Sequence, residues 1–130
     1  MNTAIVDRLC RYDELIEVGV GNRPGVATGL ADRGCRVTAT DIRDRPIPDP
    51  VEFVRDDVTD PDLSVYRGAD AVYALNCPPE LQRSVLEAAT AVDAIPLCTT
   101  LGGDPVVVDA ASETLSGATL FRLNTPGPTA

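Results

Sequence analysis

The stretch EVGVGNRPG, residues 17–25, decides the fold of this 130-residue chain. It begins within a short apolar run, residues 15–18, that predicts a β-strand. Gly19 and Gly21 then allow the backbone to turn sharply and to approach a ligand closely, and Pro24 stands where a helix would begin. A strand, a glycine-rich loop and a helix in this order are typical of a Rossmann-type α/β domain that holds an adenosine-containing ligand.

The glycine spacing, Gly-x-Gly-x-x-x-Gly, departs from the dinucleotide-binding fingerprint. The third glycine of that fingerprint would fall at Pro24, whereas this chain has Gly25. Asp41 follows Gly19 by 22 positions, at the end of the next predicted strand, where a carboxylate can bind ribose hydroxyls. The alternative interpretation of the loop is a tight strand-to-helix turn without a ligand.

The rest of the chain alternates predicted strands and helices. Helices are expected over residues 3–12, over residues 24–34 and from Pro78, and strands over residues 15–18, 35–40, 51–54, 69–75 and 94–99. The proline-rich residues 45–50 predict an irregular crossover. Near the end of the chain, residues 106–108 and 120–123 favour a closing antiparallel hairpin over a strand, helix and strand.

This alternation predicts one domain over residues 1–130, a Rossmann-like three-layer sandwich with a mostly parallel sheet. Right-handed crossovers favour a strand order in which the first and fourth strands lie side by side. Ligands bind in the crevice that opens at such a point.

The composition narrows the range of partners. All 11 basic residues are Arg, His is absent, and 20 acidic residues give a net charge of −9. A surface of this kind repels DNA and other polyanions, and it is typical of a halophilic protein, although a GC-rich genome would also favour Arg over Lys. The sequence shows neither a signal peptide nor an apolar run long enough to cross a membrane, so we expect a cytoplasmic protein.

The spacing of the cysteines matches no metal-binding motif. Cys10, Cys35, Cys77 and Cys98 are widely spaced and form no Cys-x-x-Cys pair, so no metal is expected. Cys35 and Cys98 lie in apolar runs and are expected in the core. Without His, any catalysis would depend on carboxylates, Tyr, Cys, Arg or backbone groups.

The loop resembles the first motif of class I S-adenosylmethionine-dependent methyltransferases, which has an acidic residue two positions before its first glycine, here Glu17. The resemblance implies that Glu17 orients the methionine part of the cofactor and that Gly19, Gly21 and Asn22 lie beside it. By the same resemblance, Asp41 binds the ribose. Asp41 also fits the ribose-binding carboxylate of NAD proteins.

The resemblance further implies that Asp57, in Asp-Asp-Val-Thr, faces the adenine amino group. The alternative for Asp57 is an ordinary solvated acid in an acidic loop.

The segment Asn76-Cys77-Pro78-Pro79 resembles the Asn-Pro-Pro-aromatic motif of amino-group methyltransferases. In that motif the Asn side chain and a backbone carbonyl hold the target nitrogen, so Asn76 is the candidate catalytic residue. Cys77 interrupts the motif, and Glu80 replaces the aromatic residue. An Asn cap and two prolines that open a helix would explain the same segment structurally.

The chain resembles, over nearly its full length, the uncharacterised protein family 0146 of short archaeal Rossmann-like proteins. This resemblance implies a methyltransferase relative and supplies no activity. Two functions follow: an S-adenosylmethionine-binding, methyltransferase-like domain, or a non-catalytic sensor or interaction module that binds NAD or another nucleotide. Glu17 favours the first, because its carboxylate would repel a pyrophosphate but accept hydrogen bonds from an amino group. A degenerate domain that only mediates assembly is the third interpretation.

No inserted lid or substrate domain is evident in a chain of this length. Loops, a second copy of the chain or a macromolecular substrate would therefore have to complete an acceptor site.

Overall fold

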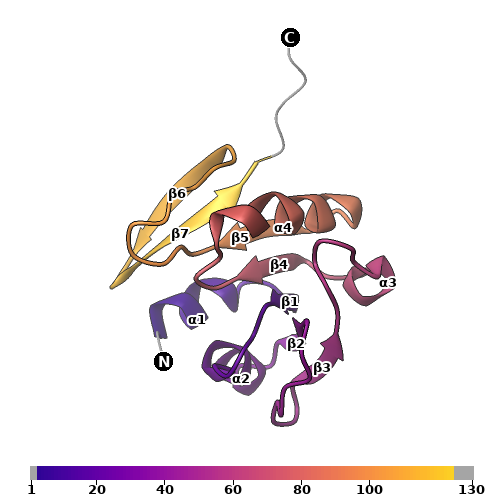
Figure 1. Cartoon of the computed structure of the whole chain (residues 1–130). Helices are drawn as coiled ribbons and strands as arrows, with labels where there is room; N and C mark the ends of the chain where they lie inside the picture. Colours follow the sequence, from indigo (N-terminus) through magenta and orange to yellow (C-terminus); the bar gives the residue numbers. More distant parts are fainter. Residues whose placement is uncertain (1–2, 125–130) are drawn as a thin grey trace.

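The structure is a computed structural model that describes residues 3–124. It contains one seven-stranded sheet with helices on both faces (Figure 1). The strand order is β3-β2-β1-β4-β5-β7-β6. The strands are β1 Glu14–Val18, β2 Arg36–Asp41, β3 Glu52–Arg55, β4 Ala71–Ala74, β5 Ile95–Cys98, β6 Ala110–Leu115 and β7 Ala118–Leu123. The first five strands run parallel, and the last two pair antiparallel, which confirms the predicted three-layer sandwich closed by a hairpin.

The central strands are covered on both faces, as expected for a parallel sheet. All four residues of β4 are buried, and in β1 only Glu14 is partly exposed. β1 pairs with β2 on one side and with β4 on the other, so the predicted adjacency of the first and fourth strands is confirmed. The segments after β1 and β4 lead to helices on opposite faces of the sheet (Figure 1). Ligands of such folds bind at the carboxyl ends of the strands, at the point where the chain changes face.

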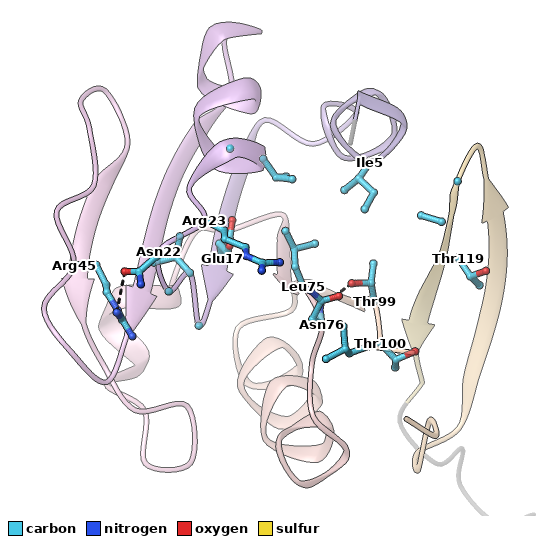
Figure 2. Close-up of a pocket in the computed structure, with 18 residues that line it drawn as sticks. Ile5, Glu17, Asn22, Arg23, Arg45, Leu75, Asn76, Thr99, Thr100 and Thr119 are labelled. Atoms are coloured by element: carbon cyan, nitrogen blue, oxygen red, sulfur yellow. Dashed lines mark hydrogen bonds between the residues drawn. The ribbon is translucent and has the colours of Figure 1, made fainter. Parts of the chain in front are cut away.

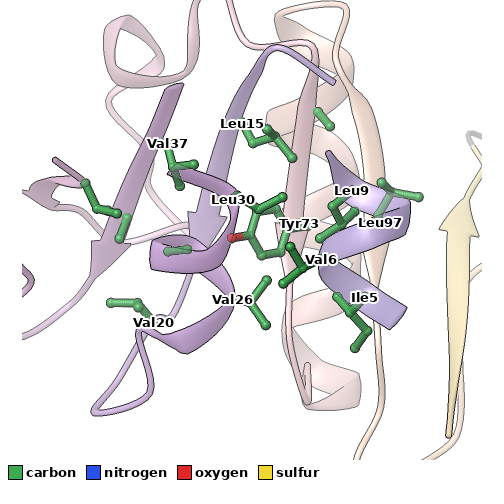
Figure 3. Close-up of a cluster of buried hydrophobic side chains, with 14 of the residues drawn as sticks. Ile5, Val6, Leu9, Leu15, Val20, Val26, Leu30, Val37, Tyr73 and Leu97 are labelled. Atoms are coloured by element: carbon green, nitrogen blue, oxygen red, sulfur yellow. The ribbon is translucent and has the colours of Figure 1, made fainter. Parts of the chain in front are cut away.

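One face of the sheet is covered by α1 Thr3–Leu9 and α2 Gly25–Asp32. Their apolar side chains interdigitate with those of β1, β4 and β5 in one hydrophobic cluster (Figure 3). The cluster includes Ile5, Val6, Leu9, Leu15, Val26, Leu30, Val37, Tyr73 and Leu97. Burial of this cluster fixes α2, and therefore the glycine loop that precedes it, against the end of β1.

The opposite face is covered by α3 Leu63–Tyr66 and α4 Pro79–Ala91. Pro79 occupies the first turn of α4, where a missing N–H costs nothing. Val85, Leu86 and Ala89 of α4 belong to a second hydrophobic cluster, which lies on this face of the sheet. Residues 45–50 form no helix, which confirms the irregular crossover between β2 and β3.

Three details of the predicted fold were wrong. The leading helix ends at Leu9 instead of reaching residue 12. Cys35 is only partly buried, because it lies just before β2 at the rim of the first cluster. Residues 106–108 form no strand, and the hairpin instead pairs Ala110–Leu115 with Ala118–Leu123.

The physical reason for the missing strand is Gln82, which is fully buried on α4. Its Nε2 donates to the carbonyl of Pro105 at 3.0 Å, and its Oε1 accepts from the N–H of Val107 at 2.8 Å. A side chain therefore satisfies the backbone groups that a neighbouring strand would otherwise pair.

Among residues 3–124, no helix is both long enough and apolar enough to span a bilayer.

Candidate functional site

The glycine loop is held in place by hydrogen bonds from its own amides. The N–H groups of Gly19 and Val20 both donate to the carbonyl of Thr40, at 2.9 and 3.0 Å, and that of Arg23 donates to the carbonyl of Val20 at 3.2 Å. Gly21 donates its N–H to Asp41 Oδ2 at 2.8 Å. Loops that cradle phosphates present free N–H groups to the ligand. Four amides of this loop are already engaged within the protein, so they are not available to hold a phosphate.

Asp41 is the last residue of β2, and its carboxylate holds the glycine loop in place through hydrogen bonds. Besides the Gly21 amide, its carboxylate accepts the N–H of Arg43 at 3.0 Å, and it lies 3.5 Å from Arg45 Nε. Burial acts to raise the pKa of Asp41, but the amides of Arg43 and Gly21 and the charge of Arg45 together hold it below its ordinary value. The carboxylate is therefore ionised at neutral pH and lies at the carboxyl end of the strand.

Asn22 is tied to the same cluster. Its side-chain oxygen accepts a hydrogen bond of 3.0 Å from Arg45 Nη1. Arg45 therefore links the tip of the glycine loop to Asp41 and to the irregular crossover after β2. In this position Arg45 is an engaged cation, and Asn22 contributes to the wall of the cavity that the loop borders (Figure 2).

Glu17 is buried at the carboxyl end of β1, with 1% of its surface exposed. The hydroxyl of Tyr73, on the neighbouring strand β4, donates to Glu17 Oε1 at 2.7 Å. Burial raises the pKa of Glu17 to about 7, although the hydrogen bond from Tyr73 acts to lower it. No hydrogen bond within residues 3–124 engages Oε2, so this buried carboxyl group retains an acceptor for a ligand.

A cavity of about 1000 Å³ opens between the glycine loop, the ends of β4 and β5, and the turn of the β6–β7 hairpin (Figure 2). Its charged lining residues are Glu17, Arg23 and Arg45. Figure 2 shows the Arg23 side chain extending from the loop into this cavity, toward Leu75 and Asn76. Within the described part of the chain, the Arg23 guanidinium forms no hydrogen bond and no ion pair. The cavity thus contains a free cation and a buried carboxyl group that do not pair with each other.

A second pocket, of about 410 Å³, lies on the other side of Gly19. Leu75 and Asn76 line both pockets, so the two are neighbours across the end of β4. Three carboxylates line the smaller pocket, and no basic residue does; its other walls are mainly apolar. The acidic residues are Asp41, Asp56 and Asp57, and the apolar ones include Val18, Ile42, Val58, Pro78 and Leu81.

Asp57 contributes an exposed wall of the smaller pocket. Its Oδ1 accepts hydrogen bonds from the hydroxyl and the N–H of Thr59, at 2.7 and 2.9 Å, and these bonds lower the pKa of Asp57. Ile42 is 60% exposed and lines the same pocket. A flat, apolar ring with hydrogen-bond donors at its edge would fit between Ile42 and these carboxylates.

Asn76 follows β4 with a positive φ of 50°, a backbone conformation that Asn adopts more easily than most residues. Its N–H donates to Thr99 Oγ1 at 2.8 Å, so the threonine at the end of β5 fixes the turn. The structure therefore places Asn76 at the junction of the two pockets, together with Gly19.

The structure brings the candidate residues to one edge of the sheet, in two groups. Glu17, Gly21 and Asn22 line the larger cavity, Asp41 and Asp57 line the smaller pocket, and Gly19 and Asn76 line both. Sequence reasoning missed Arg23, Tyr73 and Ile42. Arg23 stands within the quoted loop, but the sequence does not reveal which arginines of an acidic protein are unpaired or which of them line a cavity.

Residues 2–124 match the model of the Uncharacterised protein family (UPF0146). The chain belongs to this family. A family member from Halobacterium salinarum is 56% identical over 114 residues, which cover 87% of this chain and 88% of the relative. Another, from Archaeoglobus fulgidus, is 43% identical over 91 residues, or 70% of each chain. These relatives confirm the resemblance to an archaeal family.

Solved structures similar to this family member include methyltransferases. An RNA methyltransferase from Salinibacter ruber in complex with S-adenosyl-L-homocysteine matches with a TM-score of 0.64 and 18% identity, over 100% of this chain and 95% of that one. A putative O-methyltransferase from Klebsiella pneumoniae matches with a TM-score of 0.50 and 12% identity, over 94% and 78%. A putative exported protein from Burkholderia pseudomallei matches over 62% of this chain and only 43% of its own length, with 19% identity and a TM-score of 0.52. At these identities the likeness shows a methyltransferase-like fold.

Proposed function

We propose that the chain binds S-adenosylmethionine across the two neighbouring pockets and is a methyltransferase-like domain. The observation that carries this proposal is the division of charge between the pockets. The smaller pocket offers carboxylates and apolar walls, and the larger cavity offers an unpaired guanidinium and a buried carboxyl group. A ligand that matches both has an uncharged half rich in hydrogen-bond donors and a zwitterionic half. S-adenosylmethionine combines adenosine with an α-amino acid.

The smaller pocket suits the adenosine half. Asp41, at the end of β2, can accept hydrogen bonds from ribose hydroxyls with the lone pairs that Gly21 and Arg43 do not use. Ile42 and Leu81 offer apolar contacts for the base, and Asp57 can accept from an amino group at its edge. In this arrangement the residues of the smaller pocket bind the adenosine half of the cofactor and orient it.

The larger cavity suits the amino-acid half. Arg23 can pair with an α-carboxylate, and Glu17 Oε2 can accept from an α-ammonium group. The cofactor supplies a methyl group activated by a sulfonium. Asn76 and Gly19 line both pockets and would flank the segment that joins the two halves.

NAD and ATP fit the same pockets less well. Four loop amides that could hold a pyrophosphate are engaged within the protein, which leaves Arg23 as the unpaired cation of the larger cavity. Three carboxylates in the smaller pocket would repel phosphate groups. The competing interpretation, a nucleotide-binding sensor, therefore predicts a different ranking of ligands.

A thermal-shift panel in molar KCl tests the proposal with S-adenosylmethionine, S-adenosylhomocysteine, NAD, NADP and ATP. A ligand at 100 times its dissociation constant stabilises a protein by about 2.7 kcal/mol. The two S-adenosyl ligands should raise the melting temperature, and NADP should have the smallest effect because Asp41 repels its 2′-phosphate. A shift with NAD or ATP but not with S-adenosylhomocysteine would favour the sensor.

Methyl transfer itself is tested at Asn76, which we assign to the acceptor side of the site. Asn76→Gly removes the side-chain amide, and glycine adopts the positive φ of this position easily. The variant therefore tests the side-chain amide without disturbing the backbone turn. We expect nearly unchanged binding of S-adenosylhomocysteine and loss of any methyl transfer to an acceptor. Loss of folding in this variant would instead indicate that the side chain only braces the turn.

A further inference from the structure

Cys77 and Cys98 lie together in the second hydrophobic cluster, at the ends of neighbouring strands. Cys98 is the last residue of β5, and Cys77 stands in the turn that leads from β4 to α4. Both are buried, at 2% and 0% exposure. The backbone joins the two segments, because the N–H of Cys77 donates to the carbonyl of Thr99 at 2.7 Å.

Both side chains are buried in this one cluster, and each thiol affects the pKa of the other. The hydrogen bond with Cys77 lowers the pKa of the Cys98 thiol, because the thiolate that forms accepts from the remaining thiol. The same contact, with burial, raises the pKa of Cys77. Cys77 Sγ also lies 3.6 Å from the carbonyl oxygen of Pro78.

The remaining two cysteines have different surroundings. Cys10 and Cys35 are partly buried at the rim of the first cluster, on the opposite face of the sheet. Cys10 Sγ lies 3.1 Å from the carbonyl of Asp7 and 3.8 Å from Arg33 Nη1. These two thiols can therefore be replaced without touching the second cluster.

Cys77 also lines the smaller pocket, which gives a small oxidant a route to its sulfur. We propose that Cys77 and Cys98 are a modification site, at which hydrogen peroxide forms a reversible disulfide. Cys98, the thiol whose pKa is lowered, attacks as the thiolate an oxygen of a peroxide that enters beside Cys77 and becomes a sulfenic acid, and the released hydroxide takes up a proton to form water. The Cys77 thiol then attacks the sulfenic sulfur, and its proton leaves with the displaced hydroxide as a second water. Two electrons pass from the sulfurs to the peroxide.

The disulfide changes the shape of the pocket wall. The sulfurs of a disulfide lie about 2.05 Å apart, so the two thiols must approach each other when the bond forms. Cys77 moves toward β5 with its neighbours Asn76 and Pro78, which line the same pocket. If the smaller pocket binds adenosine, as the proposed function states, oxidation weakens that binding.

The test uses the full chain with Cys10→Ser and Cys35→Ser, so that Cys77 and Cys98 are its only cysteines. The protein is treated with hydrogen peroxide in molar KCl, its fold is checked by circular dichroism, and it is digested with trypsin without reductant. Cleavage after Arg67, Arg83 and Arg122 places Cys77 in peptide 68–83 and Cys98 in peptide 84–122. Mass spectrometry then detects the linked pair as a species two hydrogen atoms lighter than the sum of its peptides.

We expect this linked pair to form in the folded protein, to disappear with dithiothreitol, and to be absent when Cys77→Ser or Cys98→Ser is added. Recovery of both cysteines as free thiols, or as separate oxyacids, from folded and peroxide-treated protein would overturn the proposal. Titration with S-adenosylhomocysteine separates the two claims. Oxidation should weaken binding at least tenfold, whereas a linked pair in a protein whose reduced form does not bind the ligand would contradict only the proposed function.

Discussion

The hydroxyl of Tyr73 donates a hydrogen bond of 2.7 Å to Glu17 Oε1, and the two residues are direct register partners on β4 and β1. This pair joins the two strands at which the crevice opens. It also places a carboxyl group with a pKa of about 7 beside the larger cavity, because burial disfavours the charged form.

The raised pKa of Glu17 predicts a loss of stability as the pH rises from about 4.5 to about 7. In this window the folded chain keeps a proton that the unfolded chain has released, so unfolding becomes easier with each step in pH. The full effect is about 3 kcal/mol. Glu17→Gln keeps an acceptor for Tyr73 and does not titrate. Guanidinium unfolding at pH 5 and pH 8 should therefore show a smaller loss in the variant; equal losses would refute the assigned pKa.

The glycine loop predicts a specific difference between two alanine variants. Gly19 has a φ of +72° and Gly34 a φ of +89°, and an added Cβ meets no atom within 4 Å at either position. Each substitution should cost about 1–2 kcal/mol through its backbone conformation. Gly19 lines both pockets, so Gly19→Ala should also weaken S-adenosylhomocysteine binding at least tenfold, as measured by calorimetry. Gly34→Ala is the matched control, and equal binding by the two variants would contradict a ligand at Gly19.

Asp41 should contribute to both stability and binding. Asp41→Ala leaves the amides of Gly21 and Arg43 without their acceptor and should cost about 1–3 kcal/mol in chemical unfolding. Loss of the ribose acceptor should weaken S-adenosylhomocysteine about ten- to a hundredfold. The free energy of unfolding and the affinity for S-adenosylhomocysteine are measured on the same protein preparation, by chemical unfolding and by calorimetric titration. A variant that is destabilised but binds with wild-type affinity would restrict Asp41 to bracing the loop.

The net charge of −9 predicts that the melting temperature rises from dilute buffer to molar KCl. Salt screens the repulsion among the carboxylates more than it weakens the few ion pairs, of which residues 3–124 contain four. Differential scanning calorimetry across a KCl series measures the effect. A melting temperature that does not change with salt would exclude a halophilic adaptation.

Much of the fold is predictable because it depends on local patterns. The apolar run before Gly19 and the proline after the loop predict β1 and α2, and the alternation of strands and helices places β4 beside β1. The boundaries of the hairpin depend instead on Gln82, whose hydrogen bonds to Pro105 and Val107 replace a strand. Periodicity carries no signal of a side chain that satisfies distant backbone groups.

The sequence predicts which residues line the candidate site better than it predicts which of their charged side chains are paired. Acidic residues that follow strands, such as Asp41 and Asp57, can be assigned to the crevice from the order of elements. That Arg45 is engaged and Arg23 is free depends on which carboxylates the fold brings near, and the sequence does not show this. The contact between Cys77 and Cys98 likewise depends on strand pairing across the sheet.

S-adenosylmethionine binding across the two pockets is tested most directly by a calorimetric comparison of S-adenosylhomocysteine with 5′-methylthioadenosine, which lacks the amino-acid half. The comparison uses the wild type, Arg23→Gln and, as a control for loss of charge, Arg83→Gln, whose exposed side chain lies outside both pockets. We predict that Arg23→Gln weakens S-adenosylhomocysteine at least tenfold, leaves 5′-methylthioadenosine unchanged, and that Arg83→Gln changes neither. Wild-type protein that binds neither ligand, or an Arg23→Gln variant that loses both equally, would contradict the account.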